Sequence, residues 1–148
     1  MLLSILFWFL ELGLICINAF FQVFVVILLI DVETDYAHPS DVCKKLNPIM
    51  LPEYIIHFLI AFLLLLHGNY LEFFINLPLV IFHIQRLVTK AYRLDATQIV
   101  TNMKTAKRIS FIKIGFYLLV LFNFMIRLVL TIVATIESRS FDFTFGSA

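Results

Sequence analysis

Three long apolar runs, separated by two polar segments, dominate the pattern of residues along the chain. The first run covers residues 1–30 and the third covers 109–136, and each is long enough for one membrane-spanning helix of about 20 apolar residues. The middle run, residues 49–84, would form a straight helix of about 54 Å, which is too long for one span. The pattern therefore predicts that the middle run folds back on itself.

A polar turn sequence, His67-Gly68-Asn69, marks the point where the middle run divides. Pro52 and Glu53 suit the start of its first half, and Pro78 predicts a kink in the second. We therefore predict an all-α integral membrane protein with four transmembrane helices, the middle two forming a short hairpin. A single domain, 1–148, would contain spans at about 5–30, 52–67, 70–87 and 109–136, joined by cytosolic loops 31–51 and 88–108.

The short polar segments carry three further expectations. Residues 40–46 are expected to form a short helix that stops at Asn47 and Pro48. Residues 137–148 read as a short, loose tail, and no internal repeat is visible. No basic residue precedes the first run, so it reads as a retained span and not as a cleaved signal peptide.

Composition agrees with a membrane protein. The 148 residues are 62% hydrophobic and 14% charged, whereas a soluble domain is about 45–50% apolar and ~25% charged. The net charge of +1 says nothing about partners, but seven of the eleven basic residues lie between positions 86 and 113. Such a cluster beside apolar runs indicates the cytosolic side of a membrane and argues against nucleic-acid binding. Four crossings put both loops in the cytosol and both termini in the lumen, whereas three crossings would move Lys44 and Lys45 to the other side.

Polar residues inside the apolar runs suggest contacts between helices. Four crossings place Glu11 and Arg127 at similar depth near the lumenal face, so we predict a structural ion pair between them; alternatively each side chain reaches the interface alone. Glu11, Asn18 and Gln22 share one helical face, which serves either as a docking face for another membrane helix or in packing within the bundle. Residues 95–108 resemble a capped amphipathic helix. It could lie on anionic lipid or be offered to a cytosolic coat, and the two roles are compatible.

Chemistry-bearing motifs are not apparent in the sequence. The four His and two Cys lack metal-ligand spacing, and no nucleophile elbow, phosphate-binding loop or pair of intramembrane aspartates occurs. We therefore expect no catalytic, metal or cofactor site and no enzyme activity.

An ordered set of short motifs resembles the cornichon family of endoplasmic-reticulum export receptors. The set runs from about residue 15 to 136 and includes Phe21-Gln22-Val23, Asp31-Val32-Glu33-Thr34-Asp35-Tyr36, Pro52-Glu53, Asn76-Leu77-Pro78, Leu94-Asp95-Ala96-Thr97-Gln98-Ile99 and Ser110-Phe111-Ile112-Lys113-Ile114-Gly115-Phe116. The resemblance implies a four-helix membrane protein that gathers transmembrane cargo and links it to the COPII coat. Such a receptor would be a multi-pass protein of the endoplasmic reticulum membrane that cycles through vesicles and the Golgi.

The family also implies where partners bind. A fungal motif that engages the coat's cargo-binding subunit, Ile-Phe-Arg-Thr-Leu, aligns with Ile99, Val100, Thr101, Asn102 and Met103, of which only Ile99 is identical. From the polar residues of the spans, and not from the family, we expect client helices to pack at Asn18 and Gln22 or at the hairpin around Asn76 and Pro78. Some animal members accompany AMPA-type glutamate receptors, so an auxiliary subunit of a channel or transporter is the alternative function.

Overall fold

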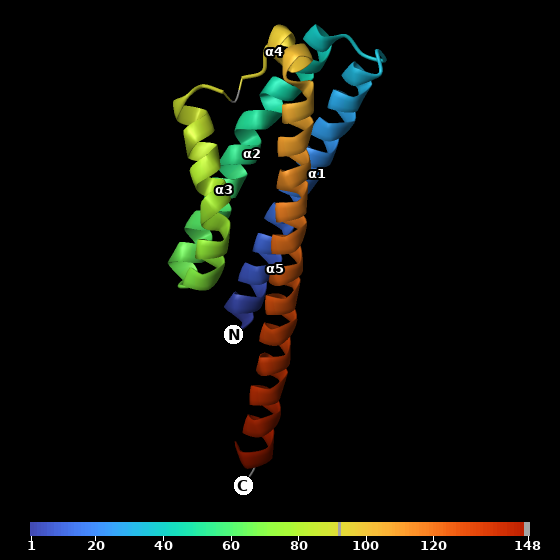
Figure 1. The fold of residues 1–148 in the computed structure, drawn as a ribbon. Helices are drawn as coiled ribbons and strands as arrows, with labels where there is room; N and C mark the ends of the chain where they lie inside the picture. The colour runs from blue at the N-terminus through green and yellow to red at the C-terminus, as the bar shows by residue number, and fades with distance from the viewer. Residues whose placement is uncertain (92, 147–148) are drawn as a thin grey trace.

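The computed structural model describes residues 1–91 and 93–146, and over these ranges it is almost entirely helical (Figure 1). Helices α1 (Leu2–Glu33), α2 (Pro39–His67), α3 (Tyr70–Val88) and α5 (Met103–Gly146) are each long and apolar enough to cross a membrane. The short helix α4 (Ala96–Thr101) precedes α5. The predicted fold class, with four spanning helices and a central hairpin, is confirmed.

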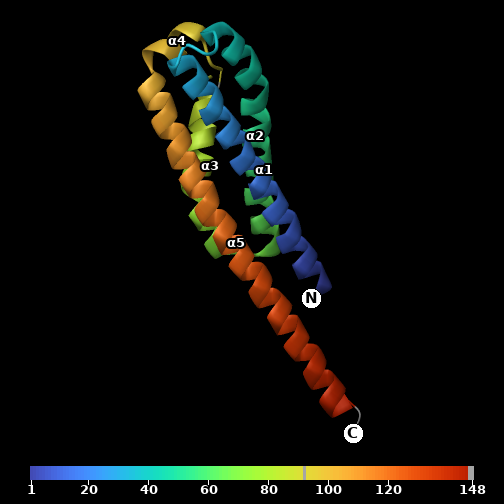
Figure 2. The same cartoon turned by 90° about the vertical axis from the view of Figure 1, so that its right-hand side faces the viewer.

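The hairpin turns at the predicted place. Gly68 ends α2 with φ 79°, in the left-handed region that glycine adopts without strain, and α3 begins at Tyr70. The connection between α1 and α2 and the short α4 lie at one end of the bundle, whereas the turn between α2 and α3 and both termini lie toward the other (Figures 1 and 2). We call the first of these the loop end and the second the terminal end.

Two predicted boundaries between residues 39 and 52 are wrong: the end of a short helix at Asn47 and Pro48, and the start of the second span at about residue 52. Residues 39–51 belong to α2, which runs through Pro48 and Pro52 without a break. The Asn47 side chain does not stop the helix because it is bound elsewhere: its amide donates to the Leu94 carbonyl at 3.2 Å and its carbonyl accepts the Leu94 amide at 2.8 Å. This pair of hydrogen bonds ties the linker before α4 to α2.

The expected loose tail is also wrong as far as Gly146, and residues 147–148 lie outside the described ranges. No proline or glycine interrupts the sequence after Gly115 until Gly146, so nothing stops the helix. The Thr144 hydroxyl also donates to the Ser140 carbonyl within the extension. Figure 2 shows this last part of α5 projecting beyond the other helices.

The segment 95–108 is not one capped helix. It is interrupted at Asn102, between α4 and α5, and Asp95 makes no side-chain cap: its carboxylate accepts a bond from the Thr97 hydroxyl at 3.1 Å instead.

Two buried apolar clusters lie at different heights in the bundle. One holds α1, α2, α3 and α5 together toward the terminal end and includes Trp8, Ile60 and Phe124. The other, at the loop end, packs Ile99 of α4 among residues of α1 and α2 such as Leu29 and Leu46. Helix α5 packs mainly along α1, and α3 packs along α2. Among the described residues the α3 backbone approaches that of α5 at few points, and side chains such as Glu72 and Arg127 connect the two helices. The level between the two clusters is polar.

Candidate functional site

Glu53 of α2 is the centre of a polar network buried between the two apolar clusters. Its carboxylate has no exposed surface. One oxygen accepts bonds from the Lys113 ammonium at 3.1 Å and the Tyr117 hydroxyl at 2.7 Å, and the other accepts the Gln22 amide at 2.6 Å. Glu53 therefore joins α2 to α1 and α5.

The network continues from α2 to α3 through two histidines. His83 Nε2 lies 3.6 Å from Glu53, and His83 Nδ1 lies 3.2 Å from His57 Nδ1. His57 Nε2 is 3.4 Å from the Asn76 side-chain oxygen, and the Asn76 amide donates to the Glu72 carbonyl at 2.8 Å. His57, His83 and Asn76 have no exposed surface, so a continuous set of polar contacts connects all four spans inside the bundle.

Most of these groups were not predicted from the sequence to form a buried network, although their spacing indicates it. The sequence suggests that Glu53 begins a helix, but it is the fifteenth residue of α2. Glu53 and His57 are four residues apart, as are Lys113 and Tyr117, so each pair lies on one face of its helix. A polar pair at this spacing in a span indicates an inward face.

The predicted client-binding residues lie mostly inside the protein. Asn18, Gln22 and Asn76 are buried, so the polar face of α1 serves internal packing in this structure and not an exposed docking surface. Asn18 has no hydrogen-bond partner for its amide among the described residues. Pro78 is exposed on α3. The structure does not bring these four residues together as one exposed site.

The predicted Glu11–Arg127 ion pair does not form in this structure. Arg127 Nε lies 2.5 Å from Glu72 of α3, whose side chain is almost fully buried. The Glu11 carboxylate is buried and has no hydrogen-bond partner within the described ranges. Arg127 therefore pairs with an acidic side chain of α3, and not with the Glu11 of α1 that was predicted.

The residues aligned with the coat motif differ in exposure. Ile99 is 1% exposed and belongs to the loop-end cluster, and Met103 is partly buried against it. Val100, Thr101 and Asn102 are exposed where α4 meets α5, and they line a surface hollow together with Val32, Glu33 and Asp35 at the end of α1 and just after it. A partner could therefore touch the middle of this segment but not Ile99.

The buried polar side chains serve the structure of the bundle. Within residues 1–91 and 93–146, no group of three or more His, Cys, Asp or Glu side chains is placed to hold a metal ion. The buried contacts instead fix four helices relative to one another, because polar groups in a span gain most from partners inside the protein.

The fold and this network define a class: small four-helix integral membrane proteins whose spans are joined by buried polar contacts. A family model described as Cornichon protein matches residues 5–126. The chain therefore belongs to the cornichon family, which confirms the resemblance found in the sequence.

Three relatives illustrate the extent of the similarity. ER-derived vesicles protein erv14 of Schizosaccharomyces pombe is 41% identical over 116 residues, covering 78% of this chain and 85% of that protein. ER-derived vesicles protein ERV15 of Saccharomyces cerevisiae is 34% identical over 114 residues, covering 77% and 80%. Protein cornichon homolog 1 of Caenorhabditis elegans is 32% identical over 123 residues, covering 78% and 85%.

Proposed function

We propose that this protein is an export receptor that gathers transmembrane clients into vesicles leaving the endoplasmic reticulum. The observation that carries the proposal is the match, over more than three quarters of the chain, to two proteins named for ER-derived vesicles. The role needs no catalysis. It needs two weak contacts made at once, one with a client in the membrane and one with the COPII coat. Because the two contacts are linked, the coat captures a receptor that carries a client more readily than one that does not.

The loop end of the bundle is proposed to face the cytosol, with both termini in the lumen. Supporting this orientation, Lys44 and Lys45 lie near the start of α2, and six of the seven basic residues of segment 86–113 lie between the last turn of α3 and the first turns of α5. These parts of the chain are at the loop end (Figure 1), and basic residues are expected in short cytosolic loops. Membrane insertion in this sense would present α4 and the start of α5 to the coat.

The coat contact is proposed at the exposed middle of the aligned motif. Val100, Thr101 and Asn102 project from the α4–α5 junction, and Val100 is an exposed apolar side chain of 59% relative exposure. Ile99 and Met103 would support this turn from below, because their side chains pack into the loop-end cluster. The proposed partner is the cargo-binding subunit of the COPII coat.

The client face is proposed on the outer side of α3. Phe74, Pro78 and Ile81 are spaced four and three residues apart, so they share one face, and all three are exposed. Of the four residues predicted to bind clients, this face includes Pro78. It does not include Asn18, Gln22 and Asn76, which are buried. A client helix would then pack on an apolar stripe and not on the internal network.

A vesicle-budding assay tests the coat contact. The triple substitution Val100→Ala, Thr101→Ala, Asn102→Ala should lower packaging of the protein into COPII vesicles several-fold. The matched control, Thr97→Ala with Gln98→Ala, changes exposed residues of the same short helix and should leave packaging unchanged. Equal packaging of both variants would contradict the coat contact.

The client role is tested by photo-crosslinking in native membranes. A crosslinker at Phe74 or Ile81 should capture transmembrane clients, whereas one at the exposed Phe122 of α5 serves as the control. If the protein is instead recovered at the cell surface in constant ratio with one channel, the function is that of an auxiliary subunit and the export proposal is wrong.

A further inference from the structure

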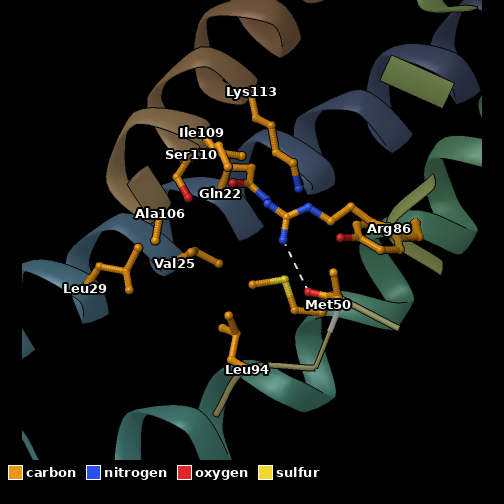
Figure 3. A pocket seen from close by; sticks show the side chains of 12 residues that line it. Gln22, Val25, Leu29, Met50, Arg86, Leu94, Ala106, Ile109, Ser110 and Lys113 are labelled. Atoms are coloured by element: carbon orange, nitrogen blue, oxygen red, sulfur yellow. Dashed lines mark hydrogen bonds between the residues drawn. The ribbon is translucent and has the colours of Figure 1, made fainter. Parts of the chain in front are cut away.

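A small cleft at the loop end is lined by all four spans and by the linker before α4 (Figure 3). It encloses about 50 Å³, enough for roughly four water-sized groups at ~12 Å³ each. Hydrogen-bond donors line it: the Arg86 guanidinium, the Lys113 ammonium and the hydroxyls of Ser110 and Tyr54. The contents of the cleft are therefore expected to be polar and rich in acceptor atoms.

Among the described residues that line the cleft, one positive charge has no ion-pair partner. Lys113 is neutralised by Glu53, as described above. Arg86 forms no ion pair with any of the described residues: it donates to the Ala91 carbonyl at 3.2 Å, and its guanidinium carbon lies 5.2 Å from the centre of the Phe82 ring. A partly buried guanidinium with free donors is well suited to a phosphate group.

A second polar atom faces the cleft without a partner. The Gln22 amide nitrogen donates to Glu53, but its oxygen is buried and has no hydrogen-bond partner within residues 1–91 and 93–146. Figure 3 shows the Gln22, Arg86 and Lys113 side chains converging in the cleft. A ligand that presents both an anionic oxygen and a hydroxyl or ammonium donor would satisfy Arg86 and Gln22 together.

An apolar groove of about 280 Å³ lies beside the cleft, between α3 and α5. Ile109 and Lys113 line both cavities, so the two are adjoining. The groove is bounded by Pro78, Leu79, Phe82, Ile109, Ile112, Lys113 and Phe116. On α3 these residues lie one to two turns deeper in the bundle than Arg86, which is in the last turn. A polar cleft near the helix end leading to a deeper apolar groove matches the shape of a lipid.

We propose that the cleft and groove together bind one glycerophospholipid of net negative charge. Its phosphate would accept bonds from Arg86 and Ser110, a headgroup hydroxyl or ammonium would donate to the Gln22 oxygen, and an acyl chain would fill the groove. Basic pockets between membrane helices bind anionic headgroups in this way. The lipid would add packing between α3 and α5, whose backbones approach each other closely at few points among the described residues. This inference does not depend on the export role.

The headgroup part is tested with purified full-length protein in nonionic detergent. Binding of phosphatidylinositol and phosphatidylcholine is measured by native mass spectrometry and by the rise in thermal unfolding temperature. Phosphatidylinositol should bind more tightly than phosphatidylcholine, which has no headgroup donor for Gln22. Arg86→Gln should weaken phosphatidylinositol binding about tenfold, as expected for losing a hydrogen bond to a charged group.

Two variants separate a binding role of Arg86 from a folding role. Arg86→Lys keeps the charge and should keep most of the binding. Arg108→Gln removes an exposed arginine at the same end of the bundle that lines none of the cavities described, and should leave binding unchanged. If Arg86→Gln binds phosphatidylinositol as well as the unchanged protein, or if Arg108→Gln loses as much binding, the headgroup site is wrong.

The acyl-chain part has its own pair of variants. Ile112→Trp places a larger side chain at the groove and should weaken lipid binding several-fold. Phe111→Trp changes a neighbouring position that is similarly exposed but does not line the groove, and should leave binding unchanged. Inorganic phosphate alone should not raise the unfolding temperature of the unchanged protein. If it stabilises the protein as well as the phospholipid does, or if Ile112→Trp has no effect, the cleft is a site for a free anion and the lipid proposal is overturned.

Discussion

The Glu53–Lys113 contact predicts a large loss of stability when one partner is removed. Lys113→Met keeps the length of the side chain and deletes its charge. Glu53 would then be a buried carboxylate, without exposed surface, whose remaining bonds come from the neutral donors Gln22 and Tyr117. A buried charge that loses its counter-charge must either remain unpaired or take up a proton, and both cost free energy.

The expected magnitude follows from the burial of both groups. Removing one partner of a buried ion pair typically costs about 3–5 kcal/mol. Because Gln22 and Tyr117 still bind the carboxylate at 2.6 and 2.7 Å, we expect a value near the lower limit, about 3 kcal/mol. The double variant Glu53→Gln with Lys113→Met leaves no buried charge and should recover at least about half of this loss.

The free energy of unfolding is measured by denaturing the protein in mixed micelles and following helical circular dichroism and the fluorescence of the single tryptophan, Trp8. Lys107→Met is the matched control, since it breaks a more exposed ion pair with Glu33 and should cost about 1 kcal/mol or less. The reasoning is refuted if Lys113→Met costs no more than Lys107→Met. It is also refuted if the double variant is no more stable than Lys113→Met alone.

Three further substitutions test individual features of the fold by the same unfolding measurement. Glu11→Gln should leave stability unchanged or slightly raised, because the buried carboxylate has no hydrogen-bond partner to lose among the described residues; a marked loss would restore the ion pair predicted from sequence. Gly68→Ala should cost about 1–2 kcal/mol for the left-handed turn, whereas Gly13→Ala within α1 should not destabilise. Ile99→Ala should cost about 2–5 kcal/mol in the loop-end cluster, and Val100→Ala, on the surface, about 0.5 kcal/mol or less.

The spans could be predicted because a bilayer imposes a simple requirement on sequence. Each crossing needs a continuous apolar stretch with all backbone bonds made internally, and the 67–69 turn is a visible interruption. The ends of the helices carry no such requirement. Helix α2 extends beyond the membrane-like run because Asn47 binds the Leu94 backbone, a residue 47 positions away, and no local pattern signals that contact.

The sequence predicts the depth of the polar side chains in the membrane, but not which of them contact one another. Counting residues along a helix gives the depth of a side chain in the membrane, so Glu11 and Arg127 could be placed at similar levels. It does not give the direction from which a neighbouring helix approaches. Arg127 turns to Glu72 because α3 brings an acidic group to that level, and the position of α3 depends on how it packs against α2.

The same geometry singles out α3 as the least constrained span. Helix α1 packs along α5 and α2, but α3 is held to α2 by the His57, His83 and Asn76 contacts and to α5 by the Arg127–Glu72 pair toward the terminal end. Toward the loop end, an apolar groove separates α3 from α5. The exposed stripe through Pro78 lies on this same helix. A partner that binds α3, whether a client helix or a lipid, therefore acts where the fewest internal contacts must change, while the Glu53 network keeps the other three spans in place.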